Sequence, residues 1–235
     1  MLWPDTFNNY FHPETAMAAA DVLEAAGFAV QLPKGNVCCG RPLYDFGMLE
    51  RAKKLLLRTL TTLEREIADG IPIIVLEPSC ASVFRDEMLN LFPDDLRAQK
   101  LATQVMLLSE FLEKHGKNFK LPEIKRKALM HGHCHHKSVM KMRVEESVLR
   151  RMGVDYQAPA PGCCGMAGAF GFEKEKYATS IAIGELELLP AVRNAPADWL
   201  IIADGFSCRE QIQQCTGRTS MHLAELIQMG LGKSR

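Results

Sequence analysis

The triplet Cys-Cys-Gly occurs twice in the sequence, at residues 38–40 and 163–165. The two copies lie 125 residues apart (163 − 38) in a chain of 235 residues. Adjacent cysteines bridge each other only with a strained backbone, so neither pair is expected to form its own disulfide. The doubled triplet therefore predicts two copies of one structural unit.

Other landmarks repeat at almost the same spacing. Residues 22–28 resemble residues 148–154 at an offset of 126 (148 − 22). Cys80 and Cys208 each follow a serine and differ by 128 (208 − 80). Landmarks that keep their order at so long a period indicate a duplicated domain, because solenoid repeats are much shorter.

We expect two homologous lobes, one spanning 1–120 and the other 121–235. Apolar residues make up 47% of the sequence and charged residues 24%, which is enough for two small cores. The 28 Lys and Arg balance the 28 Asp and Glu, so no nucleic-acid partner is expected. The sequence has no unbroken apolar run of about 18 residues and no signal-peptide pattern. We therefore expect no transmembrane segment and a cytoplasmic location.

Short apolar runs alternate with helical patterns in the second half. We expect strands at 128–130, 154–158 and 199–203, and helices at 139–152 and 173–189. This alternation is typical of parallel sheets covered by helices. The expected fold class is α/β, with a small parallel sheet and flanking helices in each lobe and a pseudo-twofold duplication relating the lobes.

The first half has the same pattern. Helices are expected at 14–26 and 48–68, and strands at 28–32 and within the apolar run 71–76. An additional helix at 99–115 is expected to connect the two halves.

The cysteines follow the expected strands. Cys80, Cys134 and Cys208 each come just after the carboxyl end of a strand, and both Cys-Cys-Gly turns also follow strands. In open α/β sheets these ends share one edge, where ligands bind. In a reducing compartment, thiols gathered there indicate metal binding or redox chemistry rather than structural disulfides.

The two halves differ in their candidate ligands. The second half supplies Cys134, Cys163, Cys164 and Cys208, and the first half supplies Cys38, Cys39 and Cys80. Four thiolates suffice for an iron–sulfur cluster or for a tetrahedral zinc ion. Asn8 stands where the first half lacks its fourth cysteine. Asp5, His12 or an exogenous ligand must therefore complete that site, or it binds no metal.

Further residues are candidates for supporting these ligands. Gly40 and Gly165 permit a close backbone approach. His131, His133, His135 and His136 crowd Cys134, and one of them is expected to join the ligand set or to donate to a sulfur. His133 and His135, on either side of the cysteine, are the first candidates. Cys215 has no counterpart in the repeat, and we interpret it as a small buried side chain.

Three functions fit such a site. They are electron transfer through an iron–sulfur cluster of the [4Fe–4S] type, a zinc-binding structural or docking module, and thiol–disulfide chemistry without a metal. The sequence contains neither a Cys-x-x-Cys motif nor a glycine-rich nucleotide loop. A flavin site is therefore not expected in this chain, and whether the chain is itself an enzyme stays open.

The motifs resemble those of the cysteine-rich CCG domain family. Cys-Cys-Gly-Arg-Pro at 38–42 and Cys-Cys-Gly-Met-Ala-Gly at 163–168 resemble the paired family signature. The segments 77–80, 133–135 and 205–212 resemble its flanking motifs. The family includes a cysteine-rich subunit of heterodisulfide reductase, the iron–sulfur subunit of glycolate oxidase and lactate-utilisation proteins. The similarity covers nearly all of the chain and is greatest to the C-terminal region of FAD-linked oxidases of the D-lactate and glycolate type.

The resemblance implies an iron–sulfur domain or subunit of a flavin-linked oxidoreductase that acts on 2-hydroxy acids. FAD would then lie on a partner or on a domain outside this chain. The implied partners are a flavoprotein and a ferredoxin-like module of the same complex, through which the chain would be peripheral to the inner membrane. A component of a heterodisulfide-type reductase is the alternative within the family, although each flanking motif here has a single cysteine where those reductases have Cys-x-x-Cys.

Overall fold

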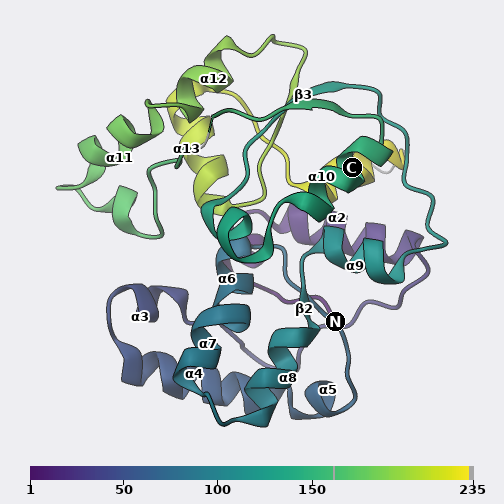
Figure 1. Cartoon of the computed structure of the whole chain (residues 1–235), viewed down its shortest axis with the longest axis vertical. Helices are drawn as coiled ribbons and strands as arrows, with labels where there is room; N and C mark the ends of the chain where they lie inside the picture. The colour runs from purple at the N-terminus through teal and green to yellow at the C-terminus, as the bar shows by residue number, and fades with distance from the viewer. Residues whose placement is uncertain (161, 233–235) are drawn as a thin grey trace.

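Two small parallel sheets organise the computed structural model, which describes residues 1–160 and 162–232 (Figure 1). In the second half, β3 (Lys127–Met130) lies between β4 (Asp155–Gln157) and β5 (Leu200–Ile202). Both neighbours run parallel to β3. β3 and β5 are short and mostly apolar because helices cover them, as expected for parallel sheets, whereas β4 is polar and largely exposed.

The sheet of the first half has the same strand order. β1 (Ile73–Ile74) pairs in parallel with β2 (Val105–Met106). On the other side of β1, Leu2 forms a parallel bridge, and its N–H donates to the Gln31 carbonyl at 2.9 Å. In the second half, Met221 forms the matching bridge to β5. The order Gln31, Leu2, β1, β2 therefore corresponds to β4, β3, β5, Met221, and the expected α/β class with two duplicated lobes is confirmed.

Helices surround both sheets. The first half contains α1 (Thr6–Tyr10), α2 (Pro13–Ala25), α3 (Arg41–Asp45), α4 (Leu49–Thr62), α5 (Glu64–Ala68), α6 (Pro78–Ser82), the π-helical turn η1 (Val83–Glu87), α7 (Met88–Leu91), α8 (Leu96–Gln104) and α9 (Leu108–His115). The second half contains the π-helical turn η2 (His136–Met140), α10 (Arg143–Arg151), the 3-10 turn η3 (Phe170–Phe172), α11 (Tyr177–Gly184), α12 (Leu188–Asn194), α13 (Phe206–Thr216) and α14 (Leu223–Gly230).

Helices from opposite halves pack together. α2 of the first half lies along α14 of the second, and α9 lies against α10 (Figure 1). These pairs enclose one core, in which Val22 and Leu23 meet Val148 and Leu149. Burying such a side chain contributes roughly 1.5–3 kcal/mol. The lobes are therefore joined by shared apolar packing, and the division at residue 120 stays a prediction.

A buried arginine reinforces this junction. The guanidinium of Arg209 in α13 donates to the Thr15 hydroxyl at 2.9 Å and to the Asn8 side-chain carbonyl at 3.1 Å. It also lies 3.3 Å from a carboxylate oxygen of Glu225 in α14. The Arg209 side chain is only 5% exposed. One charge from the second half thus connects α1, α2 and α14.

The single helix predicted at 173–189 is wrong. α11 ends at Gly184 and α12 begins at Leu188. Pro190 explains the break, because it has no N–H to offer and its ring would clash with the carbonyl four residues earlier. Proline is tolerated only in the first turn of a new helix, which is where Pro190 lies.

Three other predicted elements are also interrupted or absent. The helix predicted at 99–115 is divided by β2, where Val105 becomes extended and pairs with β1. The helix predicted at 48–68 is divided at Leu63. The segment 28–32 contributes one hydrogen bond to Leu2 and forms no strand. Whether a short segment such as 105–106 or 28–32 becomes a strand depends on pairing with a distant segment. Local sequence patterns therefore do not predict such strands.

Replacing Arg209 tests the junction between the halves. Arg209→Ala leaves Glu225 without its buried cation, so the free energy of unfolding is expected to fall by about 3–5 kcal/mol. Arg193→Ala is the matched control, because Arg193 also pairs with a glutamate, but on the surface, where little change is expected. Urea denaturation of both variants measures the difference, and equal losses would contradict the assigned role.

Candidate functional site

The thiols of the first half form one group at the start of α3 and α6. The sulfur atoms of Cys39 and Cys80 lie 2.9 Å apart. The Cys38 thiol hydrogen-bonds to the neighbouring Cys39. The N–H of Gly40 lies 3.5 Å from the Cys38 sulfur. The structure thus brings together the three cysteines predicted for this half, although 41 residues separate two of them.

The second half repeats this arrangement with a fourth cysteine. The Cys164 thiol hydrogen-bonds to both Cys163 and Cys208. The N–H of Gly165 donates to the Cys163 sulfur at 3.3 Å, as Gly40 does in the first half. Cys134 is close enough to Cys163 for the two charges to interact. All four predicted cysteines of this half are therefore neighbours.

The spacing of the thiols bears on what they can bind. Among the described residues, no three cysteine sulfurs lie within 4.8 Å of one another. A tetrahedral zinc ion with bonds of about 2.3 Å requires sulfur atoms about 3.8 Å apart on every edge. A polynuclear cluster spreads its ligands over several iron atoms and accepts wider spacing. Either centre requires the thiols to move apart, since the Cys39 and Cys80 sulfurs lie only 2.9 Å from each other.

The thiols are held in their neutral form. The hydrogen bond to its neighbour and burial raise the pKa of the Cys163 thiol. For Cys80, the hydrogen bond with Cys39 lowers the pKa, but burial and the carboxylates of Asp5 and Glu77 outweigh it and raise the value to about 11. Bound cysteine is thiolate, so a cation that binds here must displace these protons. Soft cations that favour thiolate are the ones able to do so.

Histidines beside Cys134 add neutral ring nitrogens. Burial lowers the pKa of His131 to about 4 and that of His133 to about 3. His133 Nδ1 accepts the N–H of His135 at 3.2 Å and lies 3.9 Å from the Cys134 sulfur. Ligand atoms of the three consecutive residues all lie within 4.8 Å of one another. These rings can therefore contact sulfur or a bound metal, as predicted for His133 and His135.

Glu77 links the two thiol groups and was missed by the sequence analysis. One of its carboxylate oxygens accepts the N–H of Ser79 at 3.0 Å, and the other accepts the N–H of Phe206 at 2.8 Å. These donors lie in the first turns of α6 and α13, which carry Cys80 and Cys208 as their third residues. An acidic residue directly before the proline that opens a helix is the local signal of this cap.

The fourth corner of the first-half group contains no cysteine. The Thr6 side chain hydrogen-bonds to Cys38, and the carboxylate of Asp5 is close enough to raise the pKa of Cys80. Both ring nitrogens of His12 instead contact glutamates, at 2.8 and 2.9 Å. Asp5 lies near this corner, but its carboxylate accepts the N–H groups of Phe7 and Asn8 and the side-chain amide of Asn8, so it would act as a ligand only by giving up part of this helix cap. His12 is engaged elsewhere.

Cys215 lies apart from both groups. It is half-buried near the end of α13, where its charged neighbours are Glu185 and Arg193. No contact joins it to the other described cysteines. Cys215 is thus less buried than predicted, and its structural role stays a prediction.

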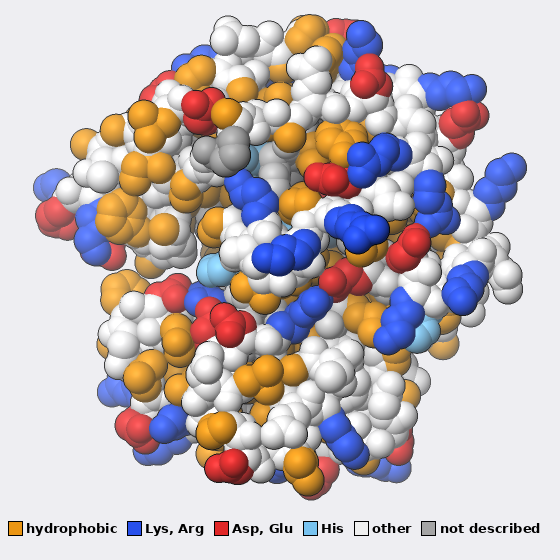
Figure 2. All heavy atoms as spheres, in the orientation of Figure 1, with side chains coloured by type: hydrophobic (Ala, Val, Ile, Leu, Met, Phe, Trp, Pro, Cys, Tyr) orange, Lys and Arg blue, Asp and Glu red, His pale blue; other side chains and the backbone are white. Residues whose placement is uncertain are grey.

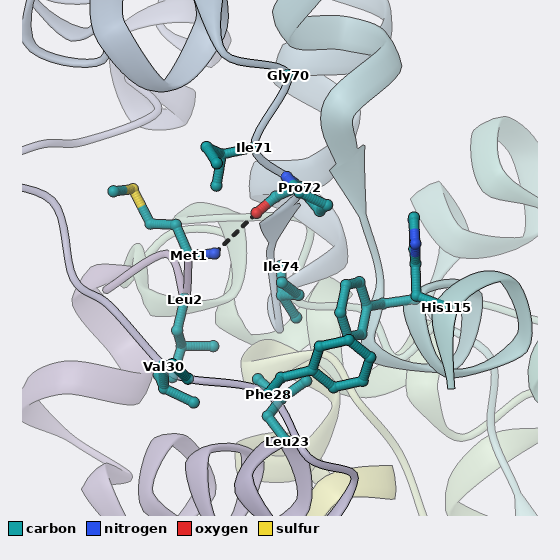
Figure 3. A pocket seen from close by; sticks show the side chains of 12 residues that line it. Met1, Leu2, Leu23, Phe28, Val30, Gly70, Ile71, Pro72, Ile74 and His115 are labelled. Atoms are coloured by element: carbon teal, nitrogen blue, oxygen red, sulfur yellow. Dashed lines mark hydrogen bonds between the residues drawn. The ribbon is translucent and has the colours of Figure 1, made fainter. Parts of the chain in front are cut away.

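An apolar cavity lies beside the N-terminus. It has a volume of about 370 Å³ and is lined mainly by apolar side chains, among them Leu23, Phe28, Ile74 and Phe111 (Figure 3). The terminal amine of Met1 closes one side by donating to the Pro72 carbonyl at 2.8 Å. No thiol lines this cavity, so the chemistry of the cysteines does not take place there.

Some of the thiols can be reached from solvent. Cys134 is exposed, and Cys38 and Cys163 are half-buried, whereas their partners are buried. In Figure 2 the surface is hollowed at the left edge, between the parts that contain α3 and α11. There the halves approach closely, since a Cβ on Gly168 would lie 3.1 Å from the carboxylate of Asp45.

The comparison with protein families agrees with the geometry. The model of the cysteine-rich domain called CCG matches residues 6–85 and 128–213. These two matches cover well over half of the chain, so the protein belongs to the CCG cysteine-rich domain family and contains two copies of the domain. The resemblance seen in the motifs is confirmed.

Three curated relatives illustrate where such chains occur. This chain is 30% identical over 232 residues to a subunit of the anaerobic glycerol-3-phosphate dehydrogenase of Escherichia coli (strain K12), covering 96% of this chain and 57% of that protein. It is 29% identical over 232 residues to lactate utilization protein A of Bacillus subtilis (strain 168), covering 92% and 93%. It is 28% identical over 229 residues to D-2-hydroxyglutarate dehydrogenase of Pseudomonas putida, covering 97% and 22%.

The chain thus spans little more than half of the Escherichia coli protein and nearly all of the Bacillus subtilis protein. Among the described helices, none combines the length and the apolar character needed to span a bilayer.

Substituting a glycine of the second triplet tests how tightly the thiols are held. Gly165 has φ of +93°, and a Cβ there would lie 2.0 Å from the Ser180 carbonyl oxygen. Gly217→Ala is the control, since that residue has φ of +69° and nothing within 4 Å. Both variants carry about 1–2 kcal/mol of left-handed strain. Only Gly165→Ala must also separate the thiol turn from α11.

We therefore expect Gly165→Ala to lose more free energy of unfolding than Gly217→Ala. We also expect its cysteines to react faster with iodoacetamide in the native state. Equal stability and equal alkylation rates in the two variants would show that the turn has room to adjust.

Proposed function

We propose that this chain is the iron–sulfur electron-transfer part of a flavin-linked oxidoreductase. The observation that carries the proposal is the gathering of four neighbouring thiols in the second half, a number that suffices for an iron–sulfur cluster. We propose the following as ligands of a [4Fe–4S] cluster: Cys134, Cys163, Cys164 and Cys208. When bound, such a cluster accepts and releases one electron at a potential set by its surroundings.

The surrounding residues are suited to holding a reduced, negatively charged cluster. The N–H of Gly165 points at the Cys163 sulfur, and hydrogen bonds to sulfur stabilise added negative charge. The ammonium of Lys137 lies close enough to Cys134 to favour its thiolate. The buried, neutral His131 and His133 contribute polar contacts without adding charge.

We propose a weaker site for the first half. Cys38, Cys39 and Cys80 supply three thiolates, and Asp5 or an exogenous ligand would be the fourth. Two carboxylates beside Cys80 already place negative charge there. A site with fewer thiolates and more unbalanced negative charge is expected to bind a cluster less firmly.

The names of the relatives support the substrate class and the partners. They refer to glycerol-3-phosphate, lactate and D-2-hydroxyglutarate, and each of these compounds carries a hydroxyl that a dehydrogenase oxidises. Two relatives are a subunit or part of a larger chain, which supports a flavoprotein that delivers electrons to this chain. We propose a 2-hydroxy acid as the substrate of that flavoprotein, FAD as its cofactor, and a ferredoxin-like module as the next carrier. We also propose a cytoplasmic chain that is peripheral to the membrane through these partners.

Cysteine variants test the proposed ligands. The wild-type chain, purified without oxygen, is expected to be brown and to contain iron and acid-labile sulfide in equal amounts. Cys163→Ser and Cys208→Ser each remove one ligand and are expected to lose most of the second-half iron, whereas Cys215→Ser retains it. Iron, sulfide and zinc analysis with visible absorption measures this. A colourless chain with one zinc ion would support the docking module instead, and equal iron loss in Cys215→Ser would overturn the assignment.

A second candidate function is thiol–disulfide exchange in the first half. The contact of 2.9 Å between the Cys39 and Cys80 sulfurs favours it, because these thiols are in position to pair. Oxidation by glutathione disulfide is then expected to link these two residues in the wild type. Peptide mass analysis after blocking free thiols detects the bond. If both cysteines remain alkylatable after oxidation while the chain stays folded, this candidate is excluded.

A further inference from the structure

A second set of metal-ligating side chains lies buried beside the thiol groups. His136 opens η2, Glu145 lies in α10, and Asp204 follows β5. One ligand atom from each lies within 4.8 Å of the other two. The three residues are only 1%, 2% and 5% exposed, respectively. No cysteine belongs to this set, which none of the proposed functions uses.

Two atoms of this set have no hydrogen-bond partner. Nδ1 of His136 and Oε2 of Glu145 are both inaccessible to solvent and unpaired. They face each other at 3.6 Å, which is too far for a hydrogen bond. A buried polar atom without a partner has lost its hydration without gaining a hydrogen bond, which is unfavourable. The imidazole nitrogen and the carboxylate oxygen are both unpaired and lie close together. Both can donate a lone pair, so this arrangement indicates a bound cation.

The duplicated fold does not require polar residues at these positions. By the offsets of the repeat, Glu145 corresponds to Ala19 (145 − 126) in α2, and Asp204 corresponds to Leu76 (204 − 128) after β1. Ala19 and Leu76 are also buried, and they pack in the apolar core that the two halves share. The second half therefore keeps two acidic groups where the same architecture packs well with hydrocarbon.

The charges around the set leave room for a cation. Burial, and then the nearby Asp204, raise the pKa of Glu145 well above its usual range. Burial also opposes ionisation of Asp204, but His222 and the hydrogen bond with Glu145 outweigh it and lower its pKa. The ring nitrogens of His222 contact the Ala224 N–H at 2.9 Å and the Leu76 carbonyl at 3.1 Å, and its Nε2 lies 3.5 Å from Asp204. Among the described residues, no lysine or arginine pairs with Glu145 or Asp204.

We propose that His136, Glu145 and Asp204 bind one divalent transition-metal ion. One imidazole and two carboxylates form a ligand set that zinc, cobalt, manganese and ferrous iron accept, and the two carboxylates neutralise a doubly charged ion. The ion would join η2, α10 and the end of β5. Because η2 begins two residues after Cys134, the metal would fix the segment that presents this cysteine. The site does not depend on a cluster at the thiols.

Cobalt is a suitable probe, because its anomalous X-ray scattering shows where it is bound. Cobalt bound at the thiols appears as separate peaks in the same map, which serve as an internal control. We would produce the full chain in medium containing CoCl₂, so that the ion enters while the chain folds. An anomalous difference map at the cobalt edge is expected to show a peak enclosed by His136, Glu145 and Asp204. If the wild-type map shows no peak between His136, Glu145 and Asp204, the proposal is overturned, whether or not cobalt is present at the thiols. The proton that Glu145 and Asp204 share would then account for this buried pair without a metal ion.

Variants add a solution measurement. Glu145→Gln and Asp204→Asn keep the volume of each side chain but lose the charge, so cobalt at this site is expected to disappear while any cobalt at the thiols remains. Glu146→Gln is the matched control. Glu146 is next to Glu145 in the sequence, but its carboxylate pairs with Arg150 near the surface. Adding cobalt is expected to raise the thermal unfolding temperature more in the wild type and in Glu146→Gln than in the two charge-removing variants. Equal shifts in all four proteins would contradict the site.

Discussion

The carboxylate of Glu77 connects the two halves at the point where both thiol groups begin. It accepts one N–H from the first turn of α6 and another from the first turn of α13. If this acceptor were lost, the buried N–H of Phe206 would be unpaired, at a cost of about 1–3 kcal/mol. The apolar core provides most of the attraction between the halves, but it is not directional. Glu77 therefore sets the relative position of the two cysteine-bearing helices.

Duplication has left the two thiol sites alike in architecture and different in chemistry. Each Cys-Cys-Gly turn directs a glycine N–H at the first sulfur, and each has a further cysteine in the first turn of a helix. The second half adds Cys134 and its histidines, whereas the first half has Thr6 and Asp5 in the corresponding corner. This asymmetry suits a pair of sites in which one binds a redox centre firmly and the other has lost or changed that role.

The sequence predicted the elements that depend on long-period repetition. The duplication, the α/β class and the convergence of the cysteines follow from the spacing of the two triplets and from their positions after strands. Pro190 could have been used to predict the break between α11 and α12, since its effect is local. The two-residue strand β2 could not, because its only signature is pairing with β1 more than thirty residues earlier.

The polar groups behind the cysteines were harder to predict. Glu77 has a local signal, but its second acceptor bond reaches Phe206, 129 residues away. His136, Glu145 and Asp204 come from three separate elements, and no spacing along the chain relates them. Such contacts form only when elements far apart in the sequence pack together, so they belong to the tertiary structure rather than to any local pattern.

X-ray absorption at the iron edge tests most directly whether the second-half thiols hold a polynuclear centre. The anaerobically purified wild-type chain is expected to show iron surrounded by sulfur, with a further shell of iron scatterers at longer distance. Iron with sulfur neighbours and no metal–metal shell, or a zinc edge with four sulfur neighbours in place of iron, would contradict the account.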